Sequence, residues 1–364
     1  LVTTVEGISE YQLDNGLTVL LMPDPSRPTT TINMTYRVGS RHEGVGETGM
    51  AHLLEHMLFY GTENHQDIKA EISERGGFAN GTTWYDRTNY FQTLPAGEEN
   101  LEWALRMEAD RMVNSIVAET DLDSEMTVVR NEFEIGENSP FRVLMQRVMA
   151  TAYLWHGYGR STIGARSDVE NVPIERLQAF YRRYYQPDNA VLILTGNFTI
   201  ERALALIEDH FGSIPRPTRT GEMQLWPSYT REPVQDGERQ VTVRRSGENQ
   251  LLMLAWHVPS ALHEDFAAIS VLSHILGDMP SGRLHKALVD TELATRVTSF
   301  SPALGEPSLL LTYSQSPLEV DLTEVEGATL ATIDDLIDNP PDEAAVQRAI
   351  SALSNGIEQI LNDS

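Results

Sequence analysis

The amino-acid sequence predicts an α+β fold of two related domains, each a mostly antiparallel sheet covered by helices. Short segments of alternating apolar and polar residues predict strands, and longer segments with apolar residues three or four apart predict helices. The order strand, strand, helix occurs on both sides of a stretch rich in Pro, Thr and Gly. The expected organisation is therefore a first domain over 1–215, a linker over 216–238 and a second domain over 239–364.

The chain begins with segments that predict strands. Asp14, Asn15 and Gly16 lie between two apolar segments. This arrangement predicts a hairpin, because Asn-Gly readily adopts the backbone conformation of two-residue turns. Residues 29–40 alternate between Thr and apolar residues and predict a third strand.

The next segment, GMAHLLEHMLFYGT over residues 49–62, predicts a helix. Thr48 is a suitable N-cap residue, and we expect the helix to continue to about Tyr60 before Gly61 ends it.

Further elements of the first domain follow from the same patterns. We expect helices over 65–77, 98–113, 119–137, 141–154, 173–185 and 199–212, extended chain with a turn near Asp86 over 78–95, and a buried strand over 189–197.

The second domain repeats the element order in a shorter chain. We expect strands over 239–245, 249–259 and 306–315, and helices over 262–277, 281–290 and 342–361. This domain lacks a counterpart of HLLEH and is short enough to have been cut before its last elements.

Composition excludes several classes of function. The 53 acidic residues outnumber the 27 basic ones and give a net charge of −26, which repels nucleic acid and anionic membranes. No stretch approaches the roughly 20 apolar residues that a membrane-spanning helix needs. The absence of cysteine excludes disulfides, cysteine nucleophiles and thiolate sites, so a transition metal must be bound by His, Asp and Glu.

The segment HLLEH has the spacing of a metal-binding helix. His52 and His56 are four apart, so their imidazoles lie on one helical face and can share an ion. Glu55 can reach a metal-bound water without displacing a ligand and take its proton. The surrounding residues are apolar, which predicts a buried helix whose His and Glu side chains need partners. The alternative is that these His and Glu residues are ordinary polar surface residues of an exposed helix.

A catalytic zinc site needs a third protein ligand, and the acidic segment over 119–137 offers candidates. Glu125 and Glu132 are seven apart and lie on one face of the expected helix. Glu134 points away from Glu132, and Glu137 lies nearer the helix end. Spacing alone does not choose among these carboxylates. His65, just beyond the helix expected to carry His52 and His56, is expected at the surface.

The order H-x-x-E-H marks the inverted zinc peptidases, and the chain resembles the pitrilysin family, which includes insulin-degrading enzyme and the mitochondrial processing peptidase. The segments that carry the resemblance are GSRHEGVGETGMAHLLEHMLFYGT, GGFANGTTWYDRTNYFQTLP, DSEMTVVRNEFE, YGRSTIGARSDVENV, FYRRYYQPDNAVLILTGNF and, after the linker, SGRLHKALVD. They occur in the family's order over most of residues 10–300. The resemblance implies a pitrilysin-like fold with a truncated second domain.

The resemblance also assigns roles to residues. It implies Zn²⁺ as the cofactor, His52 and His56 as ligands, and Glu55 as the general base. The family's third ligand lies about 75 residues after the second histidine, which corresponds to Glu132. Glu125, seven residues earlier, is implied as a further catalytic residue that orients a ligand or the zinc-bound water.

In the family, an edge strand after the second helix pairs with substrate backbone. The matching residues are Phe78, Ala79, Asn80, Gly81 and Thr82. Gly81 replaces the family's more usual Ala, which changes the fit near the scissile bond. An ordinary sheet edge is the alternative interpretation.

These features predict a zinc-dependent endopeptidase that hydrolyses peptides or small unfolded proteins by Glu-assisted attack of a zinc-bound water. The alternative is a non-catalytic scaffold or partner subunit, but such relatives typically lose part of the zinc and base set, which is complete here.

The family's active form is a chamber of four related domains. The resemblance therefore implies the N-terminal half of a longer bacterial member. Its expected partner is a complementary C-terminal half, a second subunit or a second copy in a homodimer. The family's substrate-clamping Arg and Tyr have no assignable match in this chain. Because the chain begins with Leu1 rather than Met, we expect a periplasmic or secreted protein, with the cytoplasm as the alternative.

Overall fold

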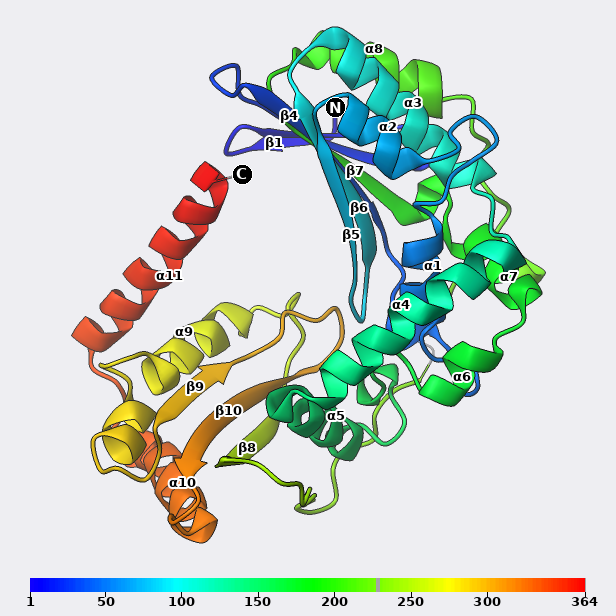
Figure 1. Cartoon of the computed structure of the whole chain (residues 1–364). Helices are drawn as coiled ribbons and strands as arrows, with labels where there is room; N and C mark the ends of the chain where they lie inside the picture. The colour runs from blue at the N-terminus through cyan, green and yellow to red at the C-terminus, as the bar shows by residue number, and fades with distance from the viewer. Residues whose placement is uncertain (227–229, 364) are drawn as a thin grey trace. The chain divides into compact units, whose positions relative to one another are not determined.

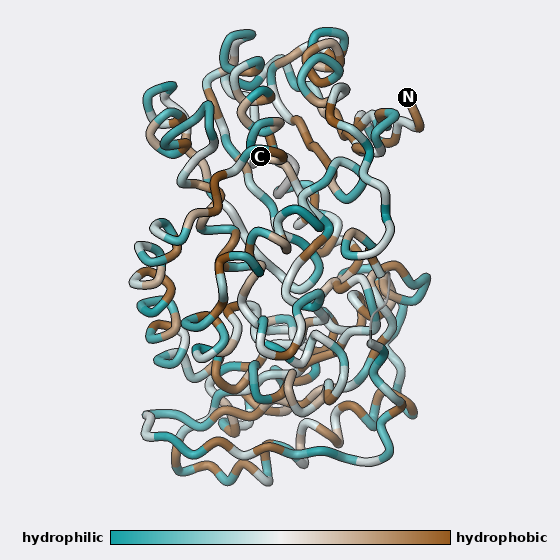
Figure 2. The backbone as a smooth tube through the Cα atoms, turned by 90° about the vertical axis from the view of Figure 1, so that its right-hand side faces the viewer, coloured by the Kyte–Doolittle hydropathy of each residue, from teal (hydrophilic) through white to brown (hydrophobic). Residues whose placement is uncertain are grey.

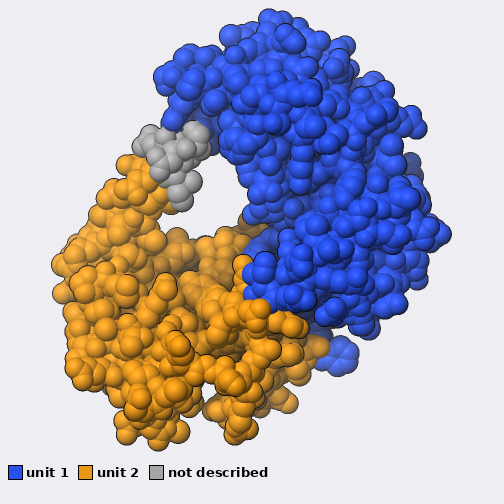
Figure 3. Space-filling model, in the orientation of Figure 1, with its two compact units in different colours: residues 1–135, 155–233 blue, residues 136–154, 234–364 orange. Residues whose placement is uncertain are grey.

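The computed structural model describes residues 1–226 and 230–363, which form two compact units, coloured separately in Figure 3. The first unit comprises residues 1–135 and 155–233, and the second comprises residues 136–154 and those from 234 onward. The predicted α+β class is confirmed. Every helix in the described ranges is too short or too polar to cross a membrane.

The first unit contains a seven-stranded sheet with the order β1-β2-β3-β7-β4-β6-β5. Its strands are β1 (Thr3–Val5), β2 (Ile8–Gln12), β3 (Thr18–Pro23), β4 (Thr29–Tyr36), β5 (Phe78–Thr83), β6 (Thr88–Pro95) and β7 (Ala190–Gly196). All neighbouring pairs are antiparallel except β3 and β7. The prediction of a mostly antiparallel sheet is therefore confirmed, and β5 is an edge strand.

The predicted hairpin joins β2 and β3, with Gln12 opposite Thr18. Asn15 fixes its turn, because its Oδ1 accepts a hydrogen bond from the Leu17 N–H at 3.1 Å. The Asn15 side-chain amide also donates to the carbonyls of Phe211 and Ile214, at the end of a helix far along the chain. The turn is therefore tied to the helical layer that it faces.

Helices cover one face of this sheet (Figure 1). They are α1 (Met50–Met57), α2 (Ile68–Glu74), α3 (Glu98–Asn114), α4 (Glu119–Glu137), α6 (Arg166–Asn171), α7 (Ile174–Tyr184) and α8 (Ile200–Phe211), with 3-10 turns over Ser40–His42, Gly157–Gly159, Pro187–Asn189 and Gly221–Met223. Most were predicted to within a few residues of their observed bounds.

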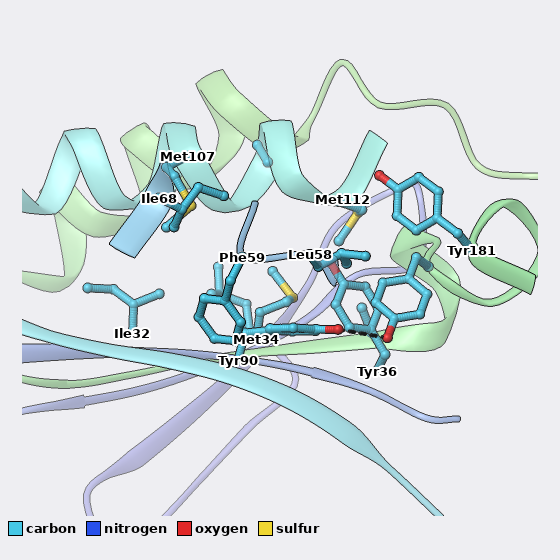
Figure 4. Close-up of a cluster of buried hydrophobic side chains, with 14 of the residues drawn as sticks. Ile32, Met34, Tyr36, Leu58, Phe59, Ile68, Tyr90, Met107, Met112 and Tyr181 are labelled. Carbon is cyan, nitrogen blue, oxygen red and sulfur yellow. Dashed lines mark hydrogen bonds between the residues drawn. The ribbon is translucent and has the colours of Figure 1, made fainter. Parts of the chain in front are cut away.

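The core of the first unit lies between the sheet and these helices. Ile32, Met34 and Tyr36 alternate along β4 and are fully buried against the helical layer. Figure 4 shows them facing Met107 of α3 and Phe59 of the turn after α1. Burying side chains of this size stabilises a fold by about 1.5–3 kcal/mol each, so the sheet gives α1 and α3 a firm support.

The second unit has a three-stranded antiparallel sheet with the order β8-β10-β9. Its elements are α5 (Pro140–Ala152), β8 (Asn249–Val258), α9 (Phe266–Gly277), a π-helical turn (His285–Val289), β9 (Arg296–Phe300), β10 (Ser308–Pro317), α10 (Leu322–Asp338) and α11 (Glu343–Asp363). Brown and teal segments alternate along many helices in Figure 2, as expected where one helical face is apolar.

One prediction for this part of the chain was wrong, and two elements were missed. Residues 239–245, predicted as a strand, form no strand. No described strand pairs with this segment, so β8 remains an edge of its sheet, and Arg239 donates instead to the carbonyls of Thr151 and Ala152. The strand β9 and the helix α10 were not predicted.

The compact units differ from the expected domain boundaries of 1–215, 216–238 and 239–364. The helix α5, placed in the first domain by the sequence, belongs to the second unit, where Phe141 contacts the rings of Phe300 and Tyr313. Within the expected linker, residues 227–229 lie outside the described residues.

Candidate metal centre

The helix α1 carries both histidines, and the side chain of Glu43, which lies outside the helix, caps its first turn. Gly49 precedes it with a positive φ of 92°, a conformation that favours glycine. The carboxylate of Glu43 accepts hydrogen bonds of 2.8 Å from the N–H groups of Gly49 and Ala51. The prediction of Thr48 as N-cap was wrong, because its hydroxyl donates to Asp168 instead. The helix ends at Met57, three residues before the expected Tyr60.

Three side chains converge at this helix. His52 and His56 bring their Nε2 atoms to 3.2 Å from each other. The Oε2 atom of Glu132, on α4, lies 3.4 Å from the first of these nitrogens and 3.6 Å from the second. Within the described residues this is the only group of His, Asp and Glu side chains whose arrangement could hold a metal ion.

The spacing of these three atoms fits zinc. Zinc–ligand bonds are about 2.0–2.2 Å long, so neighbouring ligand atoms in a tetrahedral site lie about 3.3 Å apart. The three observed separations, 3.2, 3.4 and 3.6 Å, bracket that edge length. Two imidazoles and one carboxylate also leave a fourth position for a water or a substrate, as catalytic zinc sites require.

The electrostatics of His52 favour the form that binds a metal. Burial lowers the pKa of His52 to about 3, and the neighbouring His56 acts in the same direction. The imidazole is therefore neutral at physiological pH, with a lone pair available for a cation. Its Nδ1 atom is buried and has no hydrogen-bond partner among the described residues.

His56 is oriented from its other ring nitrogen. Its Nδ1 lies 2.9 Å from Oε2 of Glu125, and the hydroxyl of Tyr60 donates to Oε1 of the same carboxylate at 3.0 Å. A carboxylate on the far nitrogen fixes the tautomer that presents Nε2 to a metal. Of the two actions implied for Glu125, this contact favours the orientation of a ligand.

The helix α4 presents both carboxylates at the border of its apolar face. Leu122 and Val129 are buried, and Met126 and Phe133 pack against the same core. This spacing is that of an amphipathic helix facing the sheet. Glu125 and Glu132 are two turns apart beside this stripe, whereas Glu134 is exposed.

Glu55 lies between α1 and the strand β5. The residue is buried, and the hydroxyl of Thr83 donates to its Oε2 at 2.8 Å. Burial raises the pKa of Glu55, while the hydrogen bond from Thr83 and the neighbouring His56 pull the pKa down. A carboxylate with a raised pKa is better suited to accept and return a proton near neutral pH.

The residues expected to bind substrate form β5, at the free edge of the sheet. Phe78 is 60 % exposed, and Asn80 and Thr82 are exposed as well. Ala79 and Gly81 face the helical layer. The Gly81 N–H donates to the Asn80 side-chain oxygen at 2.9 Å.

The sequence did not identify Tyr60 and Thr83, which contact the site residues, or Glu43, which caps the helix that carries the histidines. Tyr60 is one helical turn beyond His56, and Thr83 is two residues beyond Gly81 on the same strand face, so both spacings were available as weak signals. Glu43 gave none. His65, expected at the surface, is buried and lies 2.7 Å from Glu71.

Two family models match the chain. Residues 18–166, which contain all the converging residues, match the model described as insulinase (peptidase family M16). Residues 171–353 match the model described as peptidase M16 inactive domain.

Individual proteins give the same result. The zinc protease PqqE of Helicobacter pylori is 32% identical over 305 residues, which cover 82% of this chain and 68% of the relative. The structure of a protease from Helicobacter pylori matches with a TM-score of 0.89 and 28% identity, over 96% of this chain and 85% of that chain. The periplasmic protease PqqL of Escherichia coli matches in fold, with a TM-score of 0.76 and 21% identity, over 98% of this chain and 41% of that chain.

Proposed function

The chain belongs to peptidase family M16, the insulinase or pitrilysin family of zinc peptidases, and from this premise we propose that it is an endopeptidase acting on peptides or small unfolded proteins. Its cofactor is zinc, as in the relatives named zinc proteases. The observation that carries the proposal is the convergence of His52, His56 and Glu132 next to the buried Glu55.

His52, His56 and Glu132 would hold the ion, with two neutral imidazoles and one carboxylate as donors. When bound, zinc supplies Lewis-acid chemistry, because it lowers the pKa of a coordinated water and polarises a carbonyl oxygen. Glu125 acts through His56 by holding its ring in the tautomer that exposes Nε2.

Glu55 is the general base of the proposed reaction. Its carboxylate takes a proton from the attacking water and then gives it to the leaving amine. The raised pKa that burial gives this carboxyl suits both steps, since the group must hold the proton between them. Glu55 is close enough to His56 and Glu132 for their charges to affect its pKa, which supports its assignment to this reaction.

The edge strand β5 is the proposed substrate site. A peptide in extended conformation can add to a free sheet edge through backbone hydrogen bonds, whatever its side chains. This mode favours unfolded segments, because a folded substrate has already paired its backbone. Phe78, Ala79, Asn80, Gly81 and Thr82 would supply this edge, and Phe78 presents an exposed ring to a substrate side chain.

Family membership also motivates a proposal about partners and location. We propose that full activity needs a complementary half, a second subunit or a second copy of this chain. A periplasmic location follows the fold relative PqqL, which is named a periplasmic protease. The non-catalytic alternative draws support from the family model named inactive domain, but that match begins at residue 171, after all the candidate ligands.

Zinc content and cleavage of a quenched fluorescent peptide test the proposal. We expect Glu55→Gln to keep zinc and lose cleavage by about a thousandfold or more, and Glu132→Gln to lose zinc affinity as well. Glu134→Gln, an exposed carboxylate on the same helix, is the matched control and should behave like the wild type. Wild-type protein that binds no zinc after purification in a zinc-containing buffer would contradict the proposal.

A further inference from the structure

We propose that Gly81 and Thr83 of β5 are positioning residues that fix the two carboxylate oxygens of Glu55 in different roles. Thr83 anchors Oε2, and the missing side chain of Gly81 leaves Oε1 free to accept the proton. This inference rests on the proposed role of Glu55 as general base.

The pleat of β5 brings both residues to one face. Side chains alternate along a strand, so residues 79, 81 and 83 face α1 while residues 78, 80 and 82 face away. Burial follows this alternation: Gly81 is buried and Thr83 is half-buried, whereas Phe78, Asn80 and Thr82 are exposed. Glu55 extends from α1 toward the buried face of the strand.

Thr83 supplies the anchor. Its hydroxyl donates to Oε2 of Glu55 at 2.8 Å, and within residues 1–226 and 230–363 it is the only hydrogen-bond partner of this carboxylate. A donor on Oε2 fixes the plane of the carboxylate, because the group can no longer rotate freely about its last bond. Oε1 keeps its lone pairs for a proton.

Gly81 supplies the space. A Cβ atom at this position would lie 2.8 Å from Oε1 of Glu55, 2.9 Å from its Cγ and 3.1 Å from its Cδ. These separations are shorter than van der Waals contact, so a side chain here would displace the carboxylate. The backbone of Gly81 lacks the positive φ that requires glycine. A side chain here, such as the family's more usual Ala, would therefore have to shift the flexible Glu55 side chain and would not strain the backbone.

The arrangement couples the base to the substrate. In the proposed function, the outer edge of β5 pairs with the substrate backbone, so the same strand sets the position of the scissile peptide. Because Thr83 anchors Glu55 to that strand and Gly81 leaves room for its carboxylate, β5 positions both the base and the peptide. A base displaced by about 1 Å can cost about a hundredfold in rate.

The test compares Thr83→Val, Thr83→Ser and Gly81→Ala with the wild type in the intact protein. We expect Thr83→Val to lower kcat about tenfold to a hundredfold, the effect of one hydrogen bond to a charged group, with KM changed less than about twofold. Thr83→Ser keeps the hydroxyl and should restore most of kcat. Gly81→Ala should lower kcat less than Thr83→Val, because Ala is the family's more usual residue here and displaces only a flexible side chain. All three should keep the wild-type affinity for zinc, because Glu55 is not a ligand.

A matched control loses a threonine hydroxyl elsewhere in the same sheet. Thr35, on β4, is half-buried and donates to Asn33 at 3.2 Å, so Thr35→Val should leave kcat unchanged. The proposal is overturned if Thr83→Val retains kcat within twofold with zinc bound, or if Thr83→Ser is as slow as Thr83→Val. Glu55→Gln is measured in parallel. If that variant cleaves normally, the base assignment has failed, whereas a dead Glu55→Gln with an active Thr83→Val refutes the positioning role alone.

Discussion

At the scale of single residues, the two histidines of the metal centre differ in how they are held. The ring of His56 has a partner at each nitrogen, with Glu125 at Nδ1 and the metal-binding group at Nε2. Glu125 is itself held by the hydroxyl of Tyr60. The Nδ1 atom of His52 has no comparable partner among the described residues. The hydrogen bonds from Tyr60 to Glu125 and between Glu125 and His56 therefore orient one ligand ring, whereas no such contact in the described part of the chain orients the ring of His52.

Loss of the hydrogen bonds that join Tyr60, Glu125 and His56 should weaken zinc binding, although neither Tyr60 nor Glu125 is a ligand. We expect Glu125→Gln to lower zinc affinity about tenfold to a hundredfold, as loss of a partner behind a ligand typically does. Tyr60→Phe should act in the same direction but less, since Glu125 keeps its contact with His56. Competition with a fluorescent chelator measures both affinities, with Glu134→Gln as control. Unchanged zinc affinity in both variants would contradict the proposed role of Glu125 and Tyr60 in orienting His56.

His42 gives a prediction about acid stability. Burial lowers the pKa of His42 to about 4, and the charge of Arg41 acts in the same direction. The unfolded chain therefore binds this proton first, so the stability from neutral His42 is complete above pH 6.5 and is lost as the pH falls through 4. The contribution is about 3 kcal/mol.

The measurement is urea unfolding of the zinc-free protein between pH 4 and 7. We expect the free energy of unfolding of the wild type to fall with acid more steeply than that of His42→Gln. His263→Gln, at a half-exposed histidine, serves as control and should retain the wild-type slope. Equal slopes in the wild type and His42→Gln would refute the assignment.

What the sequence could predict at this scale depended on spacing along one element. His52, Glu55 and His56 follow from helical periodicity, and the pair Glu125 and Glu132 from its two-turn separation. The choice of Glu132 as ligand needed the family resemblance. The contacts of Thr83 with Glu55 and of Glu43 with the first turn of α1 join different elements, so no local pattern could reveal them.

At the scale of secondary structure, α3 carries an ion pair within the core. Arg111 and Glu108 are 3.1 Å apart, and both side chains are fully buried. The guanidinium also lies over the rings of Phe59 and Tyr90, at 5.1 and 4.9 Å from their centroids. The pair thus joins α3 to β6 and to the turn after α1, and so supports the helix that carries the histidines.

Loss of one partner should destabilise the first unit more than loss of both. Arg111→Met leaves Glu108 buried without its counter-charge, and we expect a loss of about 3–5 kcal/mol in unfolding free energy. Glu108→Leu combined with Arg111→Met should recover much of this, because no unpaired charge remains. Urea unfolding of Arg111→Met, Glu108→Leu and the double variant gives the coupling free energy between the two residues. Additive losses in the double variant would contradict the interpretation.

The strand prediction for residues 239–245 failed for a reason that the sequence does not contain. Alternation of apolar and polar residues shows that a segment can form a strand, but a strand also needs a neighbour to bond to. Here the guanidinium of Arg239 caps carbonyls at the end of α5 instead. The strands of the seven-stranded sheet were predicted better, since β4, β6 and β7 each have partners on both sides.

At the scale of the whole molecule, the two compact units are not two consecutive stretches of the chain. The helix α5 leaves the first unit, packs on β8 of the second, and the chain then returns to the first at residue 155. An amphipathic pattern predicts that α5 buries one face, but it does not predict against which sheet. The boundary expected near residue 215 therefore could not place this helix.

All the proposed zinc ligands lie in the first unit, so removal of the metal should affect the two units differently. Zinc that binds only the folded site stabilises it by RT ln(1 + [Zn]/Kd), about 2.7 kcal/mol at a hundredfold excess over Kd. We expect chelation with EDTA to speed amide hydrogen exchange in α1, β5 and the first part of α4. Exchange in β8 and β10 should stay unchanged, since residues 249–258 and 308–317 contribute no ligand. The same experiment on Glu132→Gln should show no effect of EDTA in either unit. Equal acceleration in both units would mean that they unfold together, and no acceleration in α1 would refute the ligand set.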